Sequence, residues 1–293
     1  MRFKDIYTKY NIMITIELQG GLGNQLFQIF TVINYALENR TQFLLPYEKK
    51  DKFSAGGSKR PTYWDSIFKE LKTFTTNKGI RAEIFPEREF KYNKLPVFNN
   101  KKLTKLFGYF QSPKYFENHY NNIIKLLDIK TKQLNISQKH FFIQNSHVYV
   151  SLHFRIGDYK TPQHNHFHPI QTVEYYEKAI RHITEQVDKP IIIMYFCEDE
   201  DLIQVNEMIG ALKTIYPNVS FERGGVQLND WEQMLLMSCC DHHIIANSSF
   251  SWWGAYFNDK PGKIVCYPEK WFSSEPHNTG TVDLFPEGWV KIE

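Results

Sequence analysis

A group of residues near the N-terminus has the composition of a phosphate-binding turn. It contains Gly20, Gly21, Gly23, Asn24 and Gln25. The β-branched run 13–18 precedes it and the apolar periodicity of 24–38 follows it, which predicts a strand, a glycine turn and a helix. Glycines there let the backbone approach a ligand closely, and the free N–H groups of the helix start favour an anion. Leu26 replaces the third glycine of the dinucleotide-binding fingerprint, so a purely structural turn is an equal alternative.

A second candidate lies at 153–158, where a predicted strand ends. Side chains two positions apart on a strand share a face, so His153 and Arg155 point to the same side. The Arg155 guanidinium presents parallel N–H donors that suit a diphosphate. Gly157 allows the chain to turn and places Asp158 next to Arg155. The alternative interpretation is a surface ion pair between Arg155 and Asp158.

A third candidate follows the strand predicted at 243–246 and opens the helix predicted at 250–257. It consists of Asn247, Ser248, Ser249 and Phe250. Serines are typical N-cap residues, and a helix N-terminus with two hydroxyl groups can hold a phosphate. Plain helix capping is the more common use of such serines. We expect Trp252 and Trp253 to be core residues and not ligand platforms.

Two groups of metal-ligand residue types are weaker candidates. One is the run Cys-Cys-Asp-His-His at 239–243, in which adjacent side chains diverge and no second pair stands at zinc spacing. The other is His164, His166 and His168 in a predicted loop, where solvent exposure or an acceptor-binding loop is the favoured interpretation. We therefore expect no metal site. The four cysteines are expected to be reduced thiols.

A regular alternation of strands and helices after residue 145 must position the second and third candidates. The predicted strands are 147–155, 191–197, 219–222, 243–246 and 263–267. The predicted helices are 172–187, 201–215, 230–239 and 250–257. Such alternation indicates a parallel, doubly wound α/β sheet, in which ligands bind at the carboxyl ends of the strands.

The first half of the chain differs in texture. Residues 49–132 are aromatic, lysine-rich and irregular, so we expect loops and short helices there. We divide the chain into an N-terminal α/β domain at 12–145 and a Rossmann-like domain at 146–293. A cleft between two such domains is the default ligand site.

Composition excludes several classes of protein. The chain has 293 residues, 42% of them hydrophobic and 23% charged, which is typical of a globular protein. The net charge of +3 comes without a basic stripe, which argues against nucleic-acid binding. No stretch reaches the about 20 apolar residues of a transmembrane helix, and the N-terminus lacks the apolar segment of a secretory signal. We expect a cytoplasmic protein whose only membrane contact would be peripheral.

Four segments in this order resemble a known family. They are Gly-Gly-Leu-Gly-Asn-Gln-Leu-Phe-Gln at 20–28, Gly-Tyr-Phe-Gln-Ser-Pro-Lys-Tyr-Phe at 108–116, the segment 153–159, and Ile-Ile-Ala-Asn-Ser-Ser-Phe-Ser-Trp-Trp-Gly-Ala at 244–255. Together they resemble glycosyltransferase family 11, the α-1,2-fucosyltransferases that use GDP-fucose, in its soluble bacterial or viral type. One departure is Ile156, where the family usually has a second arginine. Strand alternation turns position 156 away from Arg155, so we expect a packing substitution.

The resemblance implies a GT-B arrangement, in which two Rossmann-like halves with parallel sheets face a central cleft. The donor would bind the second half, which is then a GDP-sugar-binding domain, and the acceptor mainly the first. The implied reaction is an inverting, metal-independent transfer of L-fucose from GDP-β-L-fucose to the 2-hydroxyl of a galactose-terminated glycan. No cofactor beyond this donor substrate is expected.

The resemblance also implies roles for individual residues. The donor-binding residues would be Gly21, Gly23, Asn24, Gln25, His153, Arg155, Asp230, Asn247, Ser248, Ser249 and Phe250. Arg155 and Asp158 would be catalytic, with Arg155 neutralising the departing GDP and Asp158 as the first choice of general base. Glu17 is the alternative base. Two other functions stay open: transfer of fucose in an α-1,6 or O-fucosyl linkage, and carbohydrate binding without catalysis.

Overall fold

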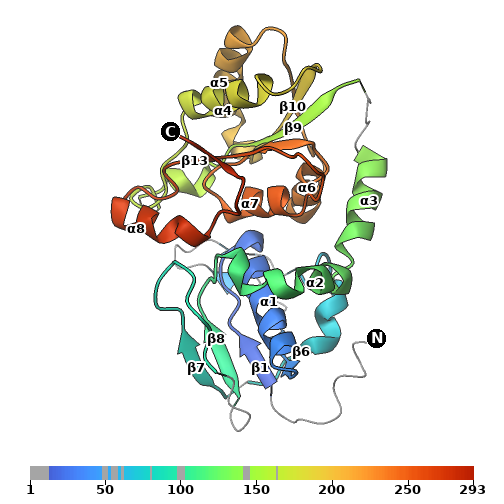
Figure 1. Cartoon of the computed structure of the whole chain (residues 1–293), viewed down its shortest axis with the longest axis vertical. Helices are drawn as coiled ribbons and strands as arrows, with labels where there is room; N and C mark the ends of the chain where they lie inside the picture. The colour runs from blue at the N-terminus through green and yellow to red at the C-terminus, as the bar shows by residue number, and fades with distance from the viewer. Residues whose placement is uncertain are drawn as a thin grey trace. The chain divides into compact units, whose positions relative to one another are not determined.

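The computed structural model describes residues 13–47, 52–53, 59–60, 63–79, 81–97, 103–140, 146–162 and 164–293. The chain forms two compact units (Figure 1). Unit 1 consists of Met1–Lys130 and Gly280–Pro286, and unit 2 consists of Thr131–Thr279 and Glu287–Glu293. The units differ in two places from the division that we predict at 145/146. Residues 12 and 145, the ends of the predicted first domain, lie outside the described residues.

Side-chain contacts explain both differences. In helix α3 (Ile129–His140), Gln133 Nε2 donates to Ser238 Oγ at 2.7 Å and to Phe257 O at 3.2 Å, which ties most of this helix to unit 2. The short helix η7 (Gly280–Asp283) joins unit 1, because Asp283 O accepts from Ser112 Oγ at 2.7 Å. Neither long-range contact has a signature in the local sequence.

Unit 1 contains a four-stranded parallel sheet in the order β2-β1-β8-β7. The bounds are β1 Met13–Ile16, β2 Gln42–Phe43, β7 Glu83–Pro86 and β8 Thr104–Phe107. Helix α1 (Leu22–Glu38) follows β1 as predicted, and its residues Leu26, Phe27, Phe30 and Ile33 are fully buried. This strand, turn and helix form the frame of the glycine motif.

The remaining elements of unit 1 are short. Strand β3 (Leu45–Pro46) pairs with β6 (Thr75–Thr76), and β4 (Lys52–Phe53) pairs with β5 (Lys59–Arg60). The short helices are η2 (Lys69–Phe74), η3 (Pro113–Tyr115), η4 (Glu117–His119) and α2 (Tyr120–Leu126). The prediction of only loops and short helices for 49–132 was wrong at the two-residue strands β4, β5 and β6 and at the four-residue strands β7 and β8. All five strands are too short to show a period, and the edge strand β7 leaves Ile84 59% exposed.

Unit 2 contains a six-stranded parallel sheet in the order β11-β10-β9-β12-β13-β14. The bounds are β9 Val148–His153, β10 Ile191–Phe196, β11 Ser220–Arg223, β12 His242–Ile244, β13 Val265–Pro268 and β14 Val290–Ile292. Numbered along the chain from β9, the order is 3-2-1-4-5-6, the order of doubly wound nucleotide-binding sheets. The predicted α/β fold with parallel sheets is confirmed. The three-residue edge strand β14 is too short for the sequence pattern to reveal.

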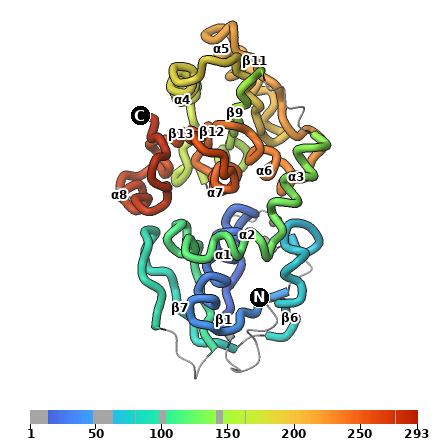
Figure 2. Tube along the Cα trace, turned by 45° about the vertical axis from the view of Figure 1, so that its right-hand side comes forward, coloured from blue at the N-terminus to red at the C-terminus, as the bar shows by residue number. Residues whose placement is uncertain are grey.

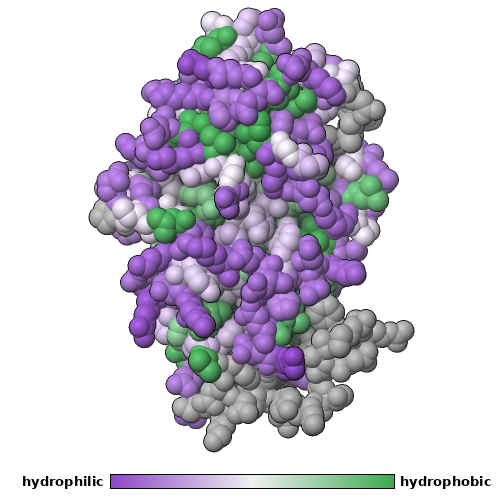
Figure 3. All heavy atoms as spheres, viewed as in Figure 1, coloured by the Kyte–Doolittle hydropathy of each residue, from purple (hydrophilic) through white to green (hydrophobic). Residues whose placement is uncertain are grey.

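Helices cover both faces of this sheet. Helices α4 (Val173–Thr184) and α5 (Leu202–Ile215) lie on one face, and α6 (Asp230–Met237) and α7 (Ser249–Tyr256) lie on the other (Figures 1 and 2). The short helix α8 (Glu275–Thr279) follows β13. Because the sheet is covered on both sides, its interior strand β10 is apolar at nearly every position and is largely buried. The face of the molecule in Figure 3 is mostly hydrophilic, with apolar residues in small separate areas.

Candidate functional site

The site lies where the strand order of unit 2 changes direction, between β9 and β12. These strands are neighbours in the sheet, and each begins a connection that leads to opposite faces. In a doubly wound sheet this arrangement leaves a crevice at the carboxyl ends of the two strands. His153 is the last residue of β9, and Asn247 and Ser248 follow β12. The fold thus brings the second and third sequence candidates together.

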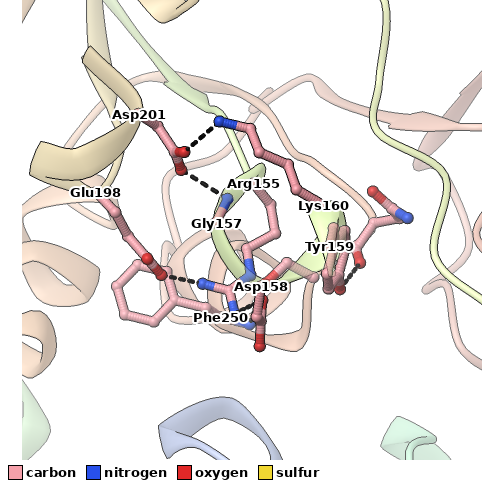
Figure 4. A network of polar contacts seen from close by, with 10 residues as sticks. Arg155, Gly157, Asp158, Tyr159, Lys160, Glu198, Asp201 and Phe250 are labelled. Carbon is pink, nitrogen blue, oxygen red and sulfur yellow. Dashed lines mark hydrogen bonds and ion pairs between the residues drawn. The ribbon is translucent and has the colours of Figure 1, made fainter. Parts of the chain in front are cut away.

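Arg155 carries two carboxylate partners on separate segments. Its Nη2 donates to Asp158 Oδ1 and its Nη1 donates to Glu198 Oε1, while the guanidinium lies 5.3 Å from the centre of the Tyr159 ring (Figure 4). Burial by itself lowers the pKa of Arg155, but Tyr159, Asp158 and Glu198 more than offset this effect, so the pKa is raised. The alternative of a surface ion pair between Arg155 and Asp158 therefore describes only part of the arrangement. The Arg155 side chain is only 18% exposed, and Glu198 is a second carboxylate partner.

Asp201 anchors the loop that carries Asp158 and Tyr159. This residue is 3% exposed, and its Oδ2 accepts from Gly157 N at 2.7 Å while its Oδ1 accepts from Lys160 Nζ at 3.0 Å (Figure 4). The loop forms the short helix η5 (Gly157–Lys160), and the Tyr159 hydroxyl donates to Asn247 O at 2.9 Å. The loop after β9 is thus fastened both to the end of β10 and to the end of β12.

Burial keeps His153 neutral at the edge of the site. Its pKa is lowered to about 3, first by desolvation and then by the nearby charge of Arg155. The imidazole ring lies 5.4 Å from the ring of Phe250, and the buried Nδ1 has no hydrogen-bond partner among the described residues. A neutral imidazole next to an aromatic ring can pack against a planar ligand and still offer one hydrogen bond.

The start of helix α7 forms the other side of the site. Ser248 is its N-cap, with Oγ accepting from Phe250 N at 3.3 Å, and Ser249 is its first residue. Asn247 Nδ2 donates to Pro169 O and Trp271 O, while the buried Asn247 Oδ1 has no hydrogen-bond partner in the part of the chain that the structure describes. Plain capping is confirmed for Ser248, and it leaves the helix N-terminus directed to the same edge as Arg155. Trp252 and Trp253 are fully buried, as predicted for core residues.

Asp230 lies farther along the same edge of the sheet. It is exposed at the first position of α6, and its Oδ1 accepts from Trp231 N at 2.7 Å. Helix α6 connects β11 to β12, the strand beside β9. The turn before Asp230 contains Gly224. A glycine is needed at this position because a Cβ there would lie 2.7 Å from Phe196 Cζ.

The glycine motif lies in unit 1, at the equivalent position of its own sheet. Gly20 has a φ of +70°, and its carbonyl accepts from Gln25 Nε2 at 3.0 Å, while Gly21 is the N-cap of α1. Asn24 Oδ1 accepts from Gln111 Nε2 at 2.7 Å, which links the turn to the 108–116 motif. Gly23 is buried in the first turn of α1. The second of the four family-like segments, 108–116, thus supports the turn that the first segment makes.

Neither candidate base is free. Asp158 Oδ1 pairs with Arg155, and Glu17 Oε2 accepts from Lys105 Nζ at 2.9 Å. The structure also adds Glu198 and Asp201 to the site, two residues that the sequence analysis missed. The available signal was the acidic run Glu-Asp-Glu-Asp at 198–201 directly after a predicted strand end.

Residues of the Cys-Cys-Asp-His-His run at 239–243 have other partners. His243 shares buried hydrogen bonds with Ser151 and Asn258, His242 Nδ1 accepts from Ile264 N, and Asp241 Oδ2 accepts from Tyr149 N. Within the described ranges, no three or more His, Cys, Asp or Glu side chains are grouped to hold a metal ion. The cysteines Cys197, Cys239, Cys240 and Cys266 are free thiols, as expected. The described part of the chain also has no helix that is long and apolar enough to span a membrane.

The fold is that of an α/β protein, and its candidate site is a group of polar residues at the switch point of a doubly wound sheet. The profile of Glycosyl transferase family 11 matches residues 3–293, and the chain belongs to this family. A relative is the O-antigen biosynthesis glycosyltransferase WbnK of Escherichia coli, 30% identical over 94% of this chain and 99% of the relative. Another is an alpha-1,2-colitosyltransferase of Escherichia coli, 28% identical over 96% of this chain and 99% of the relative. Among solved structures, fucosyltransferase NodZ from Bradyrhizobium aligns with a TM-score of 0.42 and 12% identity, over 85% of this chain and 93% of that one.

Proposed function

We propose that this glycosyltransferase moves L-fucose from GDP-β-L-fucose to the 2-hydroxyl of a galactose at the end of a glycan, in the cytoplasm. Membership of family 11 makes the chain a glycosyltransferase. The observation that carries the proposal further is the meeting of Arg155 and the start of α7 at the β9/β12 switch point. An arginine and a helix N-terminus at one edge are the two protein groups that bind a diphosphate without a metal.

In the proposed complex, the diphosphate lies between Arg155 and the α7 N-terminus, next to Ser248 and Ser249. The guanine ring lies near His153 and Phe250, and the Asp230 carboxylate accepts from its N1–H and 2-amino groups. Asn247 contributes to the same crevice. Gly21, Gly23, Asn24 and Gln25, at the helix start of α1, remain predicted donor-binding residues.

The proposed reaction is a direct displacement with inversion. The acceptor 2-hydroxyl oxygen forms a bond with the anomeric carbon as the bond to the GDP oxygen breaks, and the hydroxyl proton passes to solvent water. Arg155 stabilises the charge on the leaving diphosphate. The contact between Asp158 and Arg155 favours an orienting role for Asp158 over that of proton acceptor. No divalent metal ion is required in this scheme.

A second donor has specific support, because one relative is an alpha-1,2-colitosyltransferase. Colitose is L-fucose without its 3-hydroxyl group. A site that hydrogen-bonds this hydroxyl group rejects the deoxy sugar strongly, whereas a site that only packs against the sugar does not discriminate. The linkage to the 2-hydroxyl is common to both candidates.

The experiment is a matrix of donors and acceptors. GDP-fucose, GDP-colitose and UDP-galactose are each incubated with lactose, with a β-galactoside blocked at its 2-hydroxyl and with a glucoside. We expect GDP release and a fucosylated product only with GDP-fucose and lactose, whose galactose has a free 2-hydroxyl group. NMR of the product identifies the α-1,2 linkage. A product from the blocked galactoside would contradict the linkage. Binding of galactosides without any GDP release would instead indicate a carbohydrate-binding protein.

A further inference from the structure

We propose that Glu198 is an exchangeable counter-ion of Arg155. Its carboxylate binds the same guanidinium nitrogen as an incoming phosphate, and it leaves that nitrogen when the phosphate binds. The inference rests on the proposed function, since it requires a phosphate ligand at Arg155. It assigns to Glu198 a role in setting the affinity for that ligand. Asp158 stays in place throughout the exchange.

The two carboxylate partners of Arg155 are unequal. Asp158 is 18% exposed, belongs to the η5 turn and lies three residues from Arg155. Its turn is held by the contact from Gly157 N to Asp201 and by Thr161 Oγ1, which donates to Asp158 O at 2.7 Å. Glu198 is 51% exposed and comes from the end of β10. Glu198 is therefore the partner that can leave into water at small cost.

Gly157 shows that the Glu198 carboxylate has a fitted place. A Cβ at position 157 would stand 2.7 Å from Glu198 Oε2, and that oxygen is the far end of a flexible side chain. The backbone of Gly157 lies outside the left-handed region, so an alanine there is not strained. Gly157→Ala should therefore push the carboxylate away from Arg155 without removing its charge.

The balance of charge supports displacement. The network in Figure 4 contains the cations Arg155 and Lys160 and three carboxylates, those of Asp158, Glu198 and Asp201. Lys160 and Asp201 pair with each other, which leaves two carboxylates on Arg155. A phosphate that joins this set without displacing Glu198 would meet a site that is already negative.

The test is calorimetric binding of GDP, inorganic pyrophosphate and guanosine to the wild type and to Glu198→Gln, Gly157→Ala and Glu200→Gln. Glu200→Gln is the matched control, because Glu200 is exposed on the same turn and carries the same charge. We expect Glu198→Gln to bind GDP and pyrophosphate about three- to fivefold more tightly, the gain from losing an exposed competing ion pair. Gly157→Ala should change in the same direction. Guanosine affinity should not change, because this ligand carries no phosphate.

The outcomes separate the inference from the function. Equal or weaker pyrophosphate binding by Glu198→Gln would overturn the exchange, as would the same gain in Glu200→Gln, which would indicate a general charge effect. A gain in guanosine affinity would point to a structural change and would also overturn it. A wild-type protein that binds neither GDP nor pyrophosphate would contradict the proposed function itself.

Discussion

At the scale of single residues, several side chains fix the position of the Arg155 guanidinium. Two carboxylates and the ring of Tyr159 determine the position of its guanidinium, and Asp201 in turn positions the loop. Ile156 next to it is buried in the core, as predicted for a packing residue, although β9 ends at His153 and position 156 is therefore not part of the strand.

The kinetics of Arg155 variants test its proposed role. If Arg155 stabilises charge on the departing diphosphate, Arg155→Ala should lose about 10²-fold or more in kcat, and Arg155→Lys should recover little because lysine lacks the two-pronged geometry. Arg181→Lys is the matched control, since Arg181 lies on α4 in an exposed pair with Glu177. Steady-state kcat and donor KM decide the matter. Arg155→Ala with more than about a tenth of wild-type kcat would contradict the assignment.

At the scale of elements, strand β12 is tied to β9 by a buried histidine. Asn258 Oδ1 accepts from Lys260 N, which orients the amide so that Asn258 Nδ2 donates to His243 Nε2 at 2.7 Å. His243 Nδ1–H then donates to Ser151 Oγ at 2.7 Å. Desolvation, with the nearby charges of Lys263 and His242, holds the pKa of His243 well below its ordinary value of 6.5. The strand pair that frames the site thus depends on a neutral imidazole.

The stability of the protein should fall in mild acid for this reason. Below about pH 6.5 the unfolded chain protonates position 243 and the folded chain does not, so the free energy of unfolding decreases by up to about 1.4 kcal/mol per pH unit. His243→Leu should cost about 1–3 kcal/mol at pH 8 and show a shallower decline toward pH 5. Urea unfolding at several pH values measures this, with the exposed His166→Asn as control. A His243→Leu profile parallel to that of the wild type would contradict the neutral, buried state.

At the scale of the whole molecule, both units use the same structural rule. Each has a parallel sheet, and each places a polar or glycine-rich turn where its strand order changes direction, after β1 in unit 1 and after β9 in unit 2. The chain returns to unit 1 only at 280–286 before β14 completes the sheet of unit 2. The charged groups that face the unit 2 site are arginine, lysine and carboxylates in pairs, not a cluster of carboxylates around an empty centre.

Catalysis should therefore survive chelation. With Arg155 and helix N-termini supplying the positive charge, we expect the rate in excess EDTA to stay within about twofold of the untreated enzyme. Initial rates of GDP release before and after dialysis against EDTA give the answer, with buffer-dialysed enzyme as control. A loss of more than about tenfold, which is about 1.4 kcal/mol of barrier, that Mn²⁺ or Mg²⁺ restores would overturn this expectation.

The sequence by itself determined the features that depend on local chemistry. Long apolar runs, glycine turns and serine caps predicted β10, α1 and the start of α7, because each is set by residues within a few positions. The same local reasoning predicted that His153 and Arg155 lie together at one strand end. It missed β7, β8 and β14, since three or four residues carry too little periodicity.

Only the tertiary structure decided which residues share the site. Sheet order, which no local pattern contains, puts β9 beside β12, and the loop after β9 that follows Arg155 then contacts Asn247 through the Tyr159 hydroxyl. The same order brings the end of β10 against the loop after β9, which makes Glu198 a partner of Arg155 and Asp201 an anchor of Gly157. These contacts join residues more than 40 positions apart, because a parallel sheet aligns the carboxyl ends of strands that the chain visits at different times.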